Sequence, residues 1–588
     1  MLRIGTTFLA RGLLTAIGAA AGLALWALVR HQALMDLHPQ GYLFSAALAA
    51  VFFGGTLVLK GPLPLWRAML AALVLGLVVA GLLTWASLRF LHLPEFLASP
   101  ERMAAALILA TLPLPYAVAQ ARGNWLDYPT LFTQTWTLAM RVFGAWLFVA
   151  LIWLVVWLSD TLLRLVKVMV LSQALETPGV PWALTGAILG LGLAVGNEFS
   201  DLVSPDLALR LLRLLVVPVL AVSVLFLLAL PVHGLSTIYG GVSSTQTLLA
   251  MAVAAILLVS SAVGESDALT VRGKVMPRAT QGLALVLPVL AALGAWGVAL
   301  RVAQYGWTPP RIASALVAAA ALSYGVIYAQ AVLRGVGWAA RIRRGNGTMA
   351  LVVLAGVALT FTPALDAQRI SATSQIVRYT GGALGVADLD LQAMQDDWGL
   401  AGAAALAQLT ALSAQPGQEA LKARLAAAAA ADATEEASLA SLRATLKARL
   451  PLVPPKPGTD ALHLRDTLLY RAPPHELRLW LDACARSLPD GRPGCALVFG
   501  AYLPDRGGAQ AILLYRAPTG ALRSDAAALD PELGFQRLDT SELLPPGAAP
   551  QAADRLIAAA LDGALDVAPA RLNALSFGGD QIVIRPAP

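Results

Sequence analysis

Charged residues are scarce in this sequence. They make up 13% of its 588 residues, whereas about a quarter of the residues in an ordinary soluble protein are charged. Hydrophobic residues make up 58% of the chain, and the mean hydropathy is +0.69. The shortage of charge is uneven, because apolar runs fill the chain up to Pro363 while charges, prolines and polar turns recur beyond it. This distribution excludes a single soluble domain and predicts a membrane part followed by a water-soluble part.

The sequence motifs of common catalytic sites are missing as well. The chain has no G-x-S-x-G, no G-x-x-x-x-G-K-S/T, no H-E-x-x-H and no C-x-x-C. We therefore name no catalytic residue and expect no cofactor. The formal charge of +7 is not arranged as a basic stripe with interleaved aromatic residues, so nucleic acid is not an expected partner. The excess of Lys and Arg is interpreted as a signal of membrane topology instead.

Eleven apolar runs have, or nearly have, the length that a bilayer requires. A helix needs about 20 mostly apolar residues to cross about 30 Å of hydrocarbon. The runs are 12–29, 41–59, 68–88, 103–119, 142–158, 182–196, 211–231, 246–263, 281–300, 311–333 and 348–363. The predicted fold class is an all-α polytopic membrane helix bundle of about 11 transmembrane helices over residues 1–365, surrounded by the lipid bilayer. A soluble helical segment over 366–450 and a small α+β domain over 451–588 are expected to follow.

Lys and Arg in the short loops predict the orientation. Loops on the side of the N-terminus hold about twice as many Lys and Arg as loops on the other side, and such an excess marks the cytoplasmic side. An odd number of spans then places the tail on the opposite side. The predicted location is the bacterial cytoplasmic (inner) membrane, with a cytoplasmic N-terminus and a periplasmic C-terminal domain. One miscounted span would reverse the side of the tail.

Cysteine is almost absent, since Cys484 and Cys495 are the only two and both lie in the tail. The segment between them carries the turn signals Pro489-Asp490-Gly491 and Pro493-Gly494. It joins a predicted helix to a predicted strand, and this arrangement brings the two cysteines close enough for a disulfide. Disulfides persist in the periplasm and not in the cytosol, so a disulfide supports a periplasmic tail. The alternative is two unrelated buried thiols.

The tail begins with helical patterns and continues with mixed ones. Runs 389–413 and 418–450 are helical in composition and spacing, and the proline-rich segment 451–457 is predicted to be a linker. Beyond it, strands are predicted at 462–470, 496–502, 509–515 and 581–585, and helices at 475–488 and 550–561. The expected product is a compact α+β module.

Asp, Glu, His and Arg are absent from the expected hydrocarbon depth of the runs, where the polar residues include Tyr324, Tyr328 and Gln330. Proton- or ion-coupled carriers need ionisable side chains inside the bilayer, so this kind of transport is not expected. Prolines 113, 218 and 288 leave room for discontinuous helices with a passive or lipid-handling role. Glycines four residues apart predict close helix packing; the pairs are Gly18 and Gly22, Gly186 and Gly190, and Gly192 and Gly196.

All six histidines fall on the predicted periplasmic side. Four of them lie next to membrane runs: His31, His38, His92 and His233. Asp36 and Glu95 share loops with three of these four. Because histidine titrates near neutral pH and is a frequent metal ligand, these four are candidate ligands of zinc or parts of a pH-sensing surface. The alternative is that a few histidines happen to fall in loops, and we assign no metal to the chain.

Two stretches near the end of the membrane runs form a recognisable pair. The first is Tyr305-Gly306-Trp307-Thr308-Pro309-Pro310-Arg311, which opens the tenth run. The second comprises 371–375, Gly381, 388–390 and Trp398-Gly399-Leu400-Ala401-Gly402. Over about residues 1–410 the chain thereby resembles a bacterial inner-membrane family known only as a domain of unknown function (the 4153 type). The resemblance implies a polytopic protein of the bacterial cytoplasmic membrane with no established activity, in which Arg311 and Trp307 anchor at the interface.

These observations leave three functions open. The first is a non-enzymatic envelope protein whose bundle presents a periplasmic binding or sensing module to an unknown ligand or protein partner. The second is a transporter or lipid-handling permease with a periplasmic accessory domain, which a midplane cavity beside one of the three prolines would favour. The third, and least expected, is a membrane enzyme acting on lipid-linked substrates. Such an enzyme would need Asp, Glu, His or Arg clustered at an interface.

Overall fold

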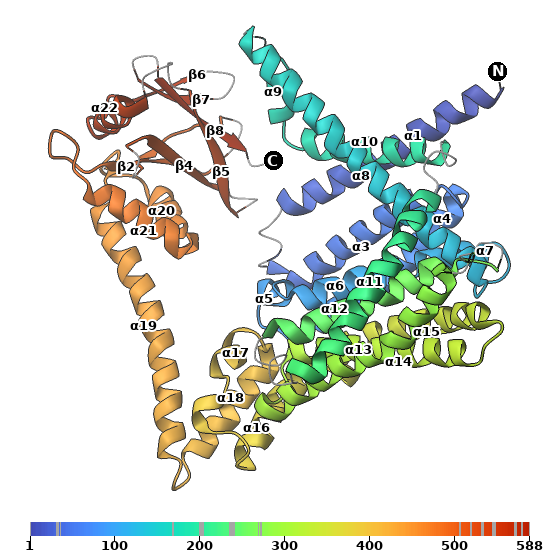
Figure 1. Ribbon diagram of the computed structural model, residues 1–588. Helices are drawn as coiled ribbons and strands as arrows, with labels where there is room; N and C mark the ends of the chain where they lie inside the picture. The colour runs from blue at the N-terminus through green and yellow to red at the C-terminus, as the bar shows by residue number, and fades with distance from the viewer. Residues whose placement is uncertain are drawn as a thin grey trace. The chain divides into compact units, whose positions relative to one another are not determined.

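The structure is a computed structural model, and it is described here in two units. Met1–Leu25, His38–Val166 and Trp182–Leu425 form the first, which we call the membrane unit. Trp26–Leu37, Lys167–Pro181 and Ala426–Pro588 form the second, and we call its last segment the C-terminal module. Figure 1 traces the chain through both. The described residues are 2–586 apart from 31–34, 36, 167, 169, 199–204, 234–241, 268–269, 271–272, 274, 505–506, 518–519, 531–533, 544–548, 570–572 and 578–579.

Long apolar helices make up most of the first 360 residues, as their composition predicts. Proline stands in the first turn of several of them, where its missing N–H leaves no helical hydrogen bond unmade. The short helix α9 (Val170–Glu176) belongs to the second unit. The others are α1 (Leu2–Arg30), α3 (Pro39–Leu59), α4 (Leu65–Ser87), α5 (Leu93–Leu97), α6 (Pro100–Thr111), α7 (Leu114–Ala121), α8 (Tyr128–Leu165), α10 (Val180–Glu198), α11 (Pro205–His233), α12 (Val242–Val263), α13 (Val275–Tyr305), α14 (Pro309–Leu333) and α15 (Trp338–Thr360).

Nine spans among the described residues are long and apolar enough to cross a membrane, and α6 and α7 together form one of them. A tenth results if α15 is joined to the helix that follows it, although the two are bent by 88°. The predicted count of eleven is therefore not confirmed. One reason is that run 182–196 forms α10, whose apolar stretch is short. The other is that run 348–363 belongs to α15, which carries Arg341, Arg343 and Arg344 in its first turns.

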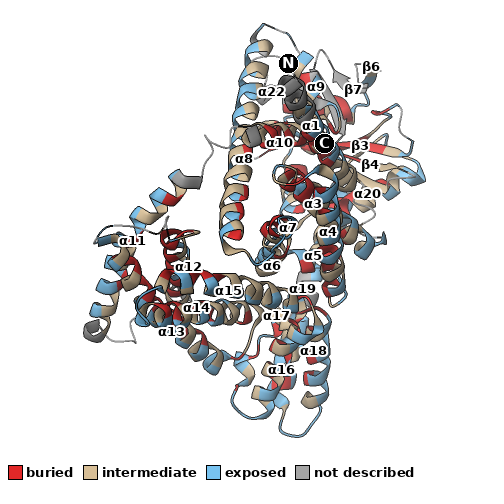
Figure 2. Ribbon diagram, turned by 90° about the vertical axis from the view of Figure 1, so that its right-hand side faces the viewer, coloured by how far each residue is buried: buried red, intermediate tan, exposed pale blue. Residues whose placement is uncertain are grey.

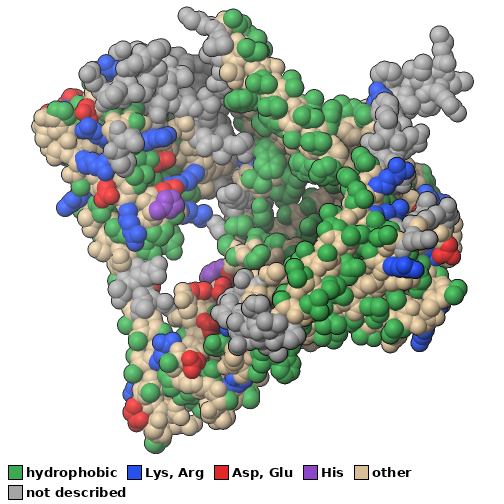
Figure 3. Space-filling view, in the orientation of Figure 1, with side chains coloured by type: hydrophobic (Ala, Val, Ile, Leu, Met, Phe, Trp, Pro, Cys, Tyr) green, Lys and Arg blue, Asp and Glu red, His purple; other side chains and the backbone are tan. Residues whose placement is uncertain are grey.

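Large apolar side chains on these helices point outward. Val74 and Val78 of α4, Leu151 of α8 and Leu225 of α11 are among those exposed. Figure 3 shows hydrophobic side chains covering the long helices on the visible face, with charged side chains gathered near their ends. A water-soluble protein rarely exposes so continuous an apolar surface. The helices are thus those of a membrane-embedded protein.

Glycines bring α1 and α10 into backbone contact. A Cβ added at Gly18 would lie 2.0 Å from the carbonyl oxygen of Gly186, and one added at Gly186 would lie 2.0 Å from that of Gly18. At Gly22 and Gly190 the added Cβ would lie 2.0 and 2.1 Å from backbone oxygens of the facing helix. The close packing predicted for these two glycine pairs is confirmed.

Three more helices follow within the membrane unit: α16 (Ala367–Thr380), α17 (Leu391–Asp396) and α18 (Gly399–Ser413). Aspartates cap two of them. The carboxylate of Asp366 accepts a hydrogen bond from the N–H of Arg369 at 3.1 Å, and that of Asp390 accepts one from the N–H of Ala393 at 3.3 Å. The next helix, α19 (Glu419–Arg449), runs from the membrane unit into the C-terminal module.

The C-terminal module is an eight-stranded sheet covered by helices on both faces. Its strands are ordered β1-β2-β3-β4-β5-β8-β7-β6, and every neighbouring pair is antiparallel except β1 and β2. The helices α20 (Thr459–Arg471) and α21 (Pro474–Ala485) pack on one face and α22 (Ala549–Leu561) on the other. Figure 2 shows buried residues along β3 and β4. The strands are β1 (Leu452–Val453), β2 (Cys495–Phe499), β3 (Ala509–Arg516), β4 (Leu522–Asp530), β5 (Gly534–Leu543), β6 (Asp566–Pro569), β7 (Asn573–Phe577) and β8 (Asp580–Pro586).

Burial on both faces explains the continuous apolar runs of the central strands. Ala496 and Val498 of β2 belong to the core cluster under α22, whereas Cys495 and Leu497 belong to the cluster under α20 and α21. Successive side chains of a strand point to opposite faces. A strand that is covered on both sides therefore shows no alternation of apolar and polar residues.

Several details of the predicted tail are corrected by the structure. The expected strand 462–470 is the helix α20, because Leu464, Leu468 and Leu469 recur at helical spacing on its buried face. The strands β4, β5, β6 and β7 were not predicted. The proline-rich linker also contributes to the fold, since Leu452 and Val453 within it pair with β2.

Candidate functional site

The two stretches singled out in the sequence lie against each other at one end of the membrane unit. The N–H of Trp307 donates to Oγ of Ser374 at 3.2 Å, and the side-chain amide of Gln375 donates to the carbonyl of Tyr305 at 3.0 Å. Between them, Gly306 has a φ of +79°, and an added Cβ would lie 3.0 Å from Cδ of Arg378. Glycine fits both the left-handed backbone and the close approach. The start of α14 is thus joined to α16.

Pro309 and Arg311 belong to the first turn of α14. Arg311 donates through Nη1 to the carbonyl of Gly306 at 2.8 Å, and its guanidinium lies 5.5 Å from the centre of the Tyr305 ring. Arg311 therefore holds the turn before its own helix, and one face of its guanidinium group is directed at an aromatic ring.

The second stretch is joined to the segment that follows α4. Trp398 is buried, and the N–H of Gly399 donates to the carboxylate of Glu95 at 2.9 Å. A Cβ at Gly399 would lie 2.5 Å from the carbonyl of Arg89, and one at Gly402 would lie 2.0 Å from the carbonyl of Met394. Both glycines are needed because backbone passes directly against them.

A charged cavity of about 570 Å³ lies between these two joints, and we call it the end cavity. Its wall is formed by the ends of α5, α6, α12, α13 and α14 together with α16 and α17. Its volume is typical of small-molecule sites, which range from about 300 to 1,000 Å³. The charged residues that line it are Glu95, Glu101, Arg102, Arg301, Arg311, Asp390 and Asp397.

Three of the four carboxylates that line the end cavity accept hydrogen bonds from neutral groups. Glu95 accepts from the N–H of Gly399, Glu101 accepts from Oγ of Ser99 at 2.9 Å, and Asp390 caps α17. Among the described residues, no hydrogen bond or ion pair reaches the carboxylate of Asp397, and none joins these four carboxylates to the side chains of Arg102 or Arg311. Arg102 and Arg311 therefore act on these carboxylates through space and not through a hydrogen bond or an ion pair.

Burial raises the pKa of two carboxyl groups that line the end cavity outside the membrane spans. One is Glu95, for which the N–H of Gly399 and the positive charge of Arg102 offset the rise in part. Burial also raises the pKa of Asp397, and the negative charges of Asp396 and Asp390 raise it further. Both groups are held in a setting that disfavours their charged form.

Arg102 lies within electrostatic reach of Glu95, Glu101 and Asp397. Its Nη2 donates to the carbonyl of Glu95 at 2.9 Å, and its guanidinium lies 4.3 Å from the ring centre of Phe90 and 5.2 Å from that of Phe96. Its Nε and Nη1 atoms are buried without a hydrogen-bond partner in the described part of the chain. The two aromatic faces supply the attraction that hydrogen bonds do not.

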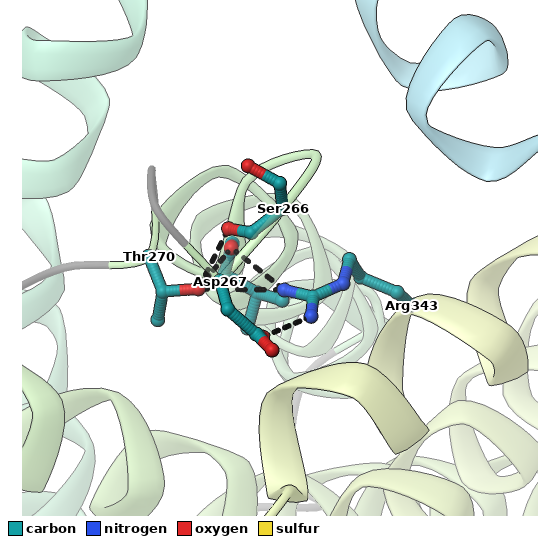
Figure 4. A network of polar contacts seen from close by, with 5 residues as sticks. Ser266, Asp267, Thr270 and Arg343 are labelled. Carbon is teal, nitrogen blue, oxygen red and sulfur yellow. Dashed lines mark hydrogen bonds and ion pairs between the residues drawn. The ribbon is translucent and has the colours of Figure 1, made fainter.

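A second polar cluster lies at the opposite ends of α12 and α15. Arg343, which is 8% exposed, donates to the carbonyl of Val263 at 3.4 Å and to Oγ1 of Thr270 at 3.3 Å, and forms an ion pair with Asp267. Figure 4 shows these contacts, together with the hydrogen bond from Thr270 to the carbonyl of Ser266 at 3.0 Å. The arginine thus fastens the segment after α12 onto α15.

The same helix end carries a network of neutral side chains. The hydroxyl of Tyr328 donates to Oδ1 of Asn346 at 2.5 Å and lies 2.9 Å from Oγ of Ser260. Nδ2 of Asn346 donates to the hydroxyl of Tyr128 at 3.0 Å and to Oγ of Ser260 at 3.2 Å. These contacts tie α8, α12, α14 and α15 together and leave no ionised group to bind a ligand. We interpret both clusters at this end as structural.

The structure does not assemble a metal site from the candidate histidines that it describes. His31 and the side chain of His233 lie outside the described residues, while His38 and His92 stand at the N-terminal ends of α3 and α5. Within the described part of the chain, no three His, Cys, Asp or Glu side chains are grouped so as to hold a metal ion. The predicted disulfide is confirmed: Cys484 and Cys495 are bonded, with their Cα atoms 4.8 Å apart.

Pro288 lies at a direct contact between two helices and not beside a midplane cavity. A Cβ at Gly325 of α14 would lie 2.8 Å from Cα of Pro288, so α13 and α14 touch there. Pro113 borders an apolar groove of about 780 Å³ between α4 and α7. Exposed side chains of Trp66 and Leu70 line this groove, so it opens to the surroundings of the helices.

Sequence reasoning did not find the end cavity, because its wall comes from seven helices that are far apart in the chain. The one available signal was that Arg102, Arg301 and Arg311 stand at the ends of apolar runs on the side with fewer basic residues.

No family model matches the chain, and no curated protein and no solved structure was found that matches it.

Proposed function

We propose that this chain is an integral protein of the bacterial cytoplasmic membrane that presents its C-terminal module in the periplasm for binding or sensing, without catalysis. The observation that carries the proposal is the disulfide between Cys484 and Cys495. Such a bond persists in the oxidising periplasm and is reduced in the cytosol. Membership of the inner-membrane family of unknown function over about residues 1–410 is part of the same proposal.

A groove in the C-terminal module supports a binding role. It has a volume of about 670 Å³ beside the edge strand β1, and Pro454, Phe499, Leu561 and Val567 are among its lining residues. Apolar grooves of this size are typical of sites for small or extended ligands.

Contacts at one end of the membrane unit support eleven spans. The N–H of Leu400 donates to the carbonyl of Arg89 at 2.9 Å, and Arg89 lies 3.6 Å from Asp366, so α4 and α15 end together. The bond from Gln375 to Tyr305 brings the end of α13 to the same place. Because α4 and α13 end on the same side, α13 begins on the opposite side, and an odd number of spans must lie between the two helices. The combined span of α6 and α7, together with α8, α11 and α12, supplies four, so we assign the fifth to α10.

Counting α10 and α15 with the nine long spans gives eleven, and the module then lies on the side opposite the N-terminus. Because Cys484 and Cys495 are the only cysteines, an impermeant thiol reagent tests this side directly. Spheroplasts that express the chain would be treated with maleimide-polyethylene glycol with and without prior reduction. We expect a gel shift only after reduction, without lysis.

A matched control places one cysteine at the other end of the bundle. In a C484A/C495A background, R334C puts a thiol at the end of α14, which is predicted to be cytoplasmic, and should be labelled only after lysis. Labelling of the wild-type cysteines that requires lysis but no reductant would show a reduced module in the cytoplasm and would reject the proposal.

The second candidate is a lipid-handling permease, and the end cavity favours it. The cavity lies where several membrane helices end, and spans of membrane length place their ends near the polar headgroups. The tight contact at Pro288 speaks against a passage between α13 and α14. A permease would move lipid between leaflets of vesicles containing the purified chain, and unchanged leaflet distributions would exclude it.

A further inference from the structure

The end cavity places charges of both signs around one space. Arg301 and Arg311 stand on the α13 and α14 side, where the charge of Arg311 interacts with those of Asp390 and Arg301. Glu95 and Asp397 stand on the side of α5 and α17, and each carboxyl lies within the electrostatic reach of the other. A ligand that carries a negative and a positive group would be attracted by both sides.

Two helix N-termini strengthen the positive side. The first turns of α12 and α14 border the cavity, through Thr245 and Arg311 among others. The N-terminus of a helix carries about half a positive charge, and its free N–H groups are typical partners of phosphate. Together with the planar guanidinium of Arg311, these ends suit a phosphate oxygen.

The negative side suits a primary ammonium group. The carboxylate of Asp397 has no hydrogen-bond partner among the described residues, and an ammonium has three N–H donors to offer. A quaternary ammonium has no such donor, and an anionic headgroup without nitrogen has no positive charge to attract the carboxylates.

The surroundings of the cavity indicate where such a ligand comes from. Its wall is formed by the ends of membrane helices and by the helices α16 and α17 that cover them. Arginines on the side with fewer Lys and Arg run against the usual charge bias, and three of them line this one space. A phospholipid headgroup lies at this depth in every bilayer.

We propose that the end cavity binds the phosphate and primary ammonium of a phosphatidylethanolamine headgroup, with Arg311 facing the phosphate and Asp397 facing the ammonium. The inference rests on the membrane embedding in the proposed function and is independent of the side on which the module lies. It assigns to the membrane unit a lipid ligand of its own.

The test uses the full chain purified in a mild detergent and counts bound lipids by native mass spectrometry. Phosphatidylethanolamine, phosphatidylcholine and phosphatidylglycerol with identical acyl chains are offered in equal amounts. We expect phosphatidylethanolamine to be retained about tenfold over the other two, which is the effect of one charge-assisted hydrogen bond. Equal retention of the three lipids would overturn the inference.

Two variants and two matched controls locate the site. D397N and R311Q should each lower retention of phosphatidylethanolamine about tenfold. D396N and R369Q change a neighbouring carboxylate and an arginine that do not line the cavity, and should retain it as the wild type does. Because Asp397 makes no described side-chain contact, D397N leaves the fold intact, and its failure to lower retention would overturn the site even if R311Q unfolds.

Free phosphoethanolamine distinguishes the lipid from a soluble source of the same chemistry. Its displacement of bound phosphatidylethanolamine would support recognition of the headgroup. Its saturable binding to a chain that retains no phosphatidylethanolamine would overturn the lipid assignment. A chain that stays soluble without detergent would instead reject the membrane embedding, so the two failures are distinguishable.

Discussion

The membrane unit and the C-terminal module solve the same packing problem in different solvents. In the module, Tyr470 and Val567 are the only large hydrophobic side chains exposed among the described residues of 426–588, and two clusters of buried side chains sandwich the sheet. In the membrane unit, the helices expose such side chains along their length and meet through glycines. Water makes the module bury its apolar surface. Lipid leaves close van der Waals contact as the main attraction between helices.

The first prediction has the largest expected effect and compares the truncation of one tryptophan in each region. Trp480 is fully buried under the sheet, and its Nε1–H donates to Asp525 at 2.8 Å. W480A should destabilise the module by about 3–5 kcal/mol, because it leaves a cavity and removes one hydrogen-bond donor from Asp525. Trp296 of α13 is 57% exposed, and W296A should change the stability of the membrane unit by less than about 1 kcal/mol. Pulse proteolysis of the full chain in urea measures both, and equal losses would contradict the contrast.

The second prediction inserts a side chain where two helices touch. G186V in α10 forces a Cβ into the backbone of α1, 2.0 Å from the carbonyl of Gly18. We expect a loss of about 3 kcal/mol, at the upper end of typical overpacking. Gly81 of α4 has no atom within 4 Å of its added Cβ, so G81V is the matched control and should be nearly neutral. Thermal unfolding of the detergent-solubilised chain compares the two, and a loss in G81V equal to that in G186V would reject the packing argument.

The third prediction removes the disulfide, which exists only in the module. Closing a loop with a sequence separation of 11 stabilises a fold by about 2–3 kcal/mol, mainly by restricting the unfolded chain. C484A/C495A should therefore lower the urea midpoint of the module and leave the thermal midpoint of the membrane unit unchanged. Wild-type protein treated with reductant should behave as the double variant does. A shift in the membrane unit would mean that the two regions are more strongly coupled than their separate cores indicate.

The fourth prediction has the smallest expected effect: the stabilities of the membrane unit and of the C-terminal module should depend on pH in opposite directions. Burial raises the pKa of Glu95 and of Asp397 in the membrane unit. Each carboxyl binds a proton more readily in the folded state, so stability should rise as the pH falls through the folded pKa towards the ordinary values of 4.5 and 3.8. In the module, burial acts to raise the pKa of Asp466, but hydrogen bonds from Lys447 and Arg465 hold it below 3.8. That stabilisation is complete above 3.8 and is lost as the pH falls through the lowered value.

Scanning calorimetry of the full chain between pH 7 and pH 3 follows both transitions. E95Q/D397N should flatten the gain of the membrane unit, and D466N should flatten the loss of the module. A membrane transition that shifts equally in wild type and in E95Q/D397N would assign the pH dependence to other groups.

Local patterns predicted what is decided by neighbours in sequence. Glycines four residues apart predicted close helix packing, which the structure shows between α1 and α10, and turn residues between Cys484 and Cys495 predicted the disulfide. The strand β4 was missed because Ala526, Ala527 and Ala528 read as readily as a helix, and only burial on both faces makes them a strand. The end cavity was missed because Glu95 and Asp397 are brought together by tertiary contacts alone. Charged residues at the ends of apolar runs can indicate the orientation of the chain in the membrane or a binding site, and the sequence alone does not distinguish the two.

The order of strands in the module has a consequence for its synthesis. The strand β5 pairs with β8, so Leu543 cannot pair until Gln581 has been synthesised. The strands β6 and β7 are joined to the rest of the sheet only through β8. At about 5–20 residues per second, a ribosome needs about 2 to 8 seconds to make the intervening chain. During that time β5 presents an unpaired edge, which is a template for pairing with another chain. The module is therefore a fold that needs protection while it is being made, and a chaperone that binds extended segments would have its best opportunity there.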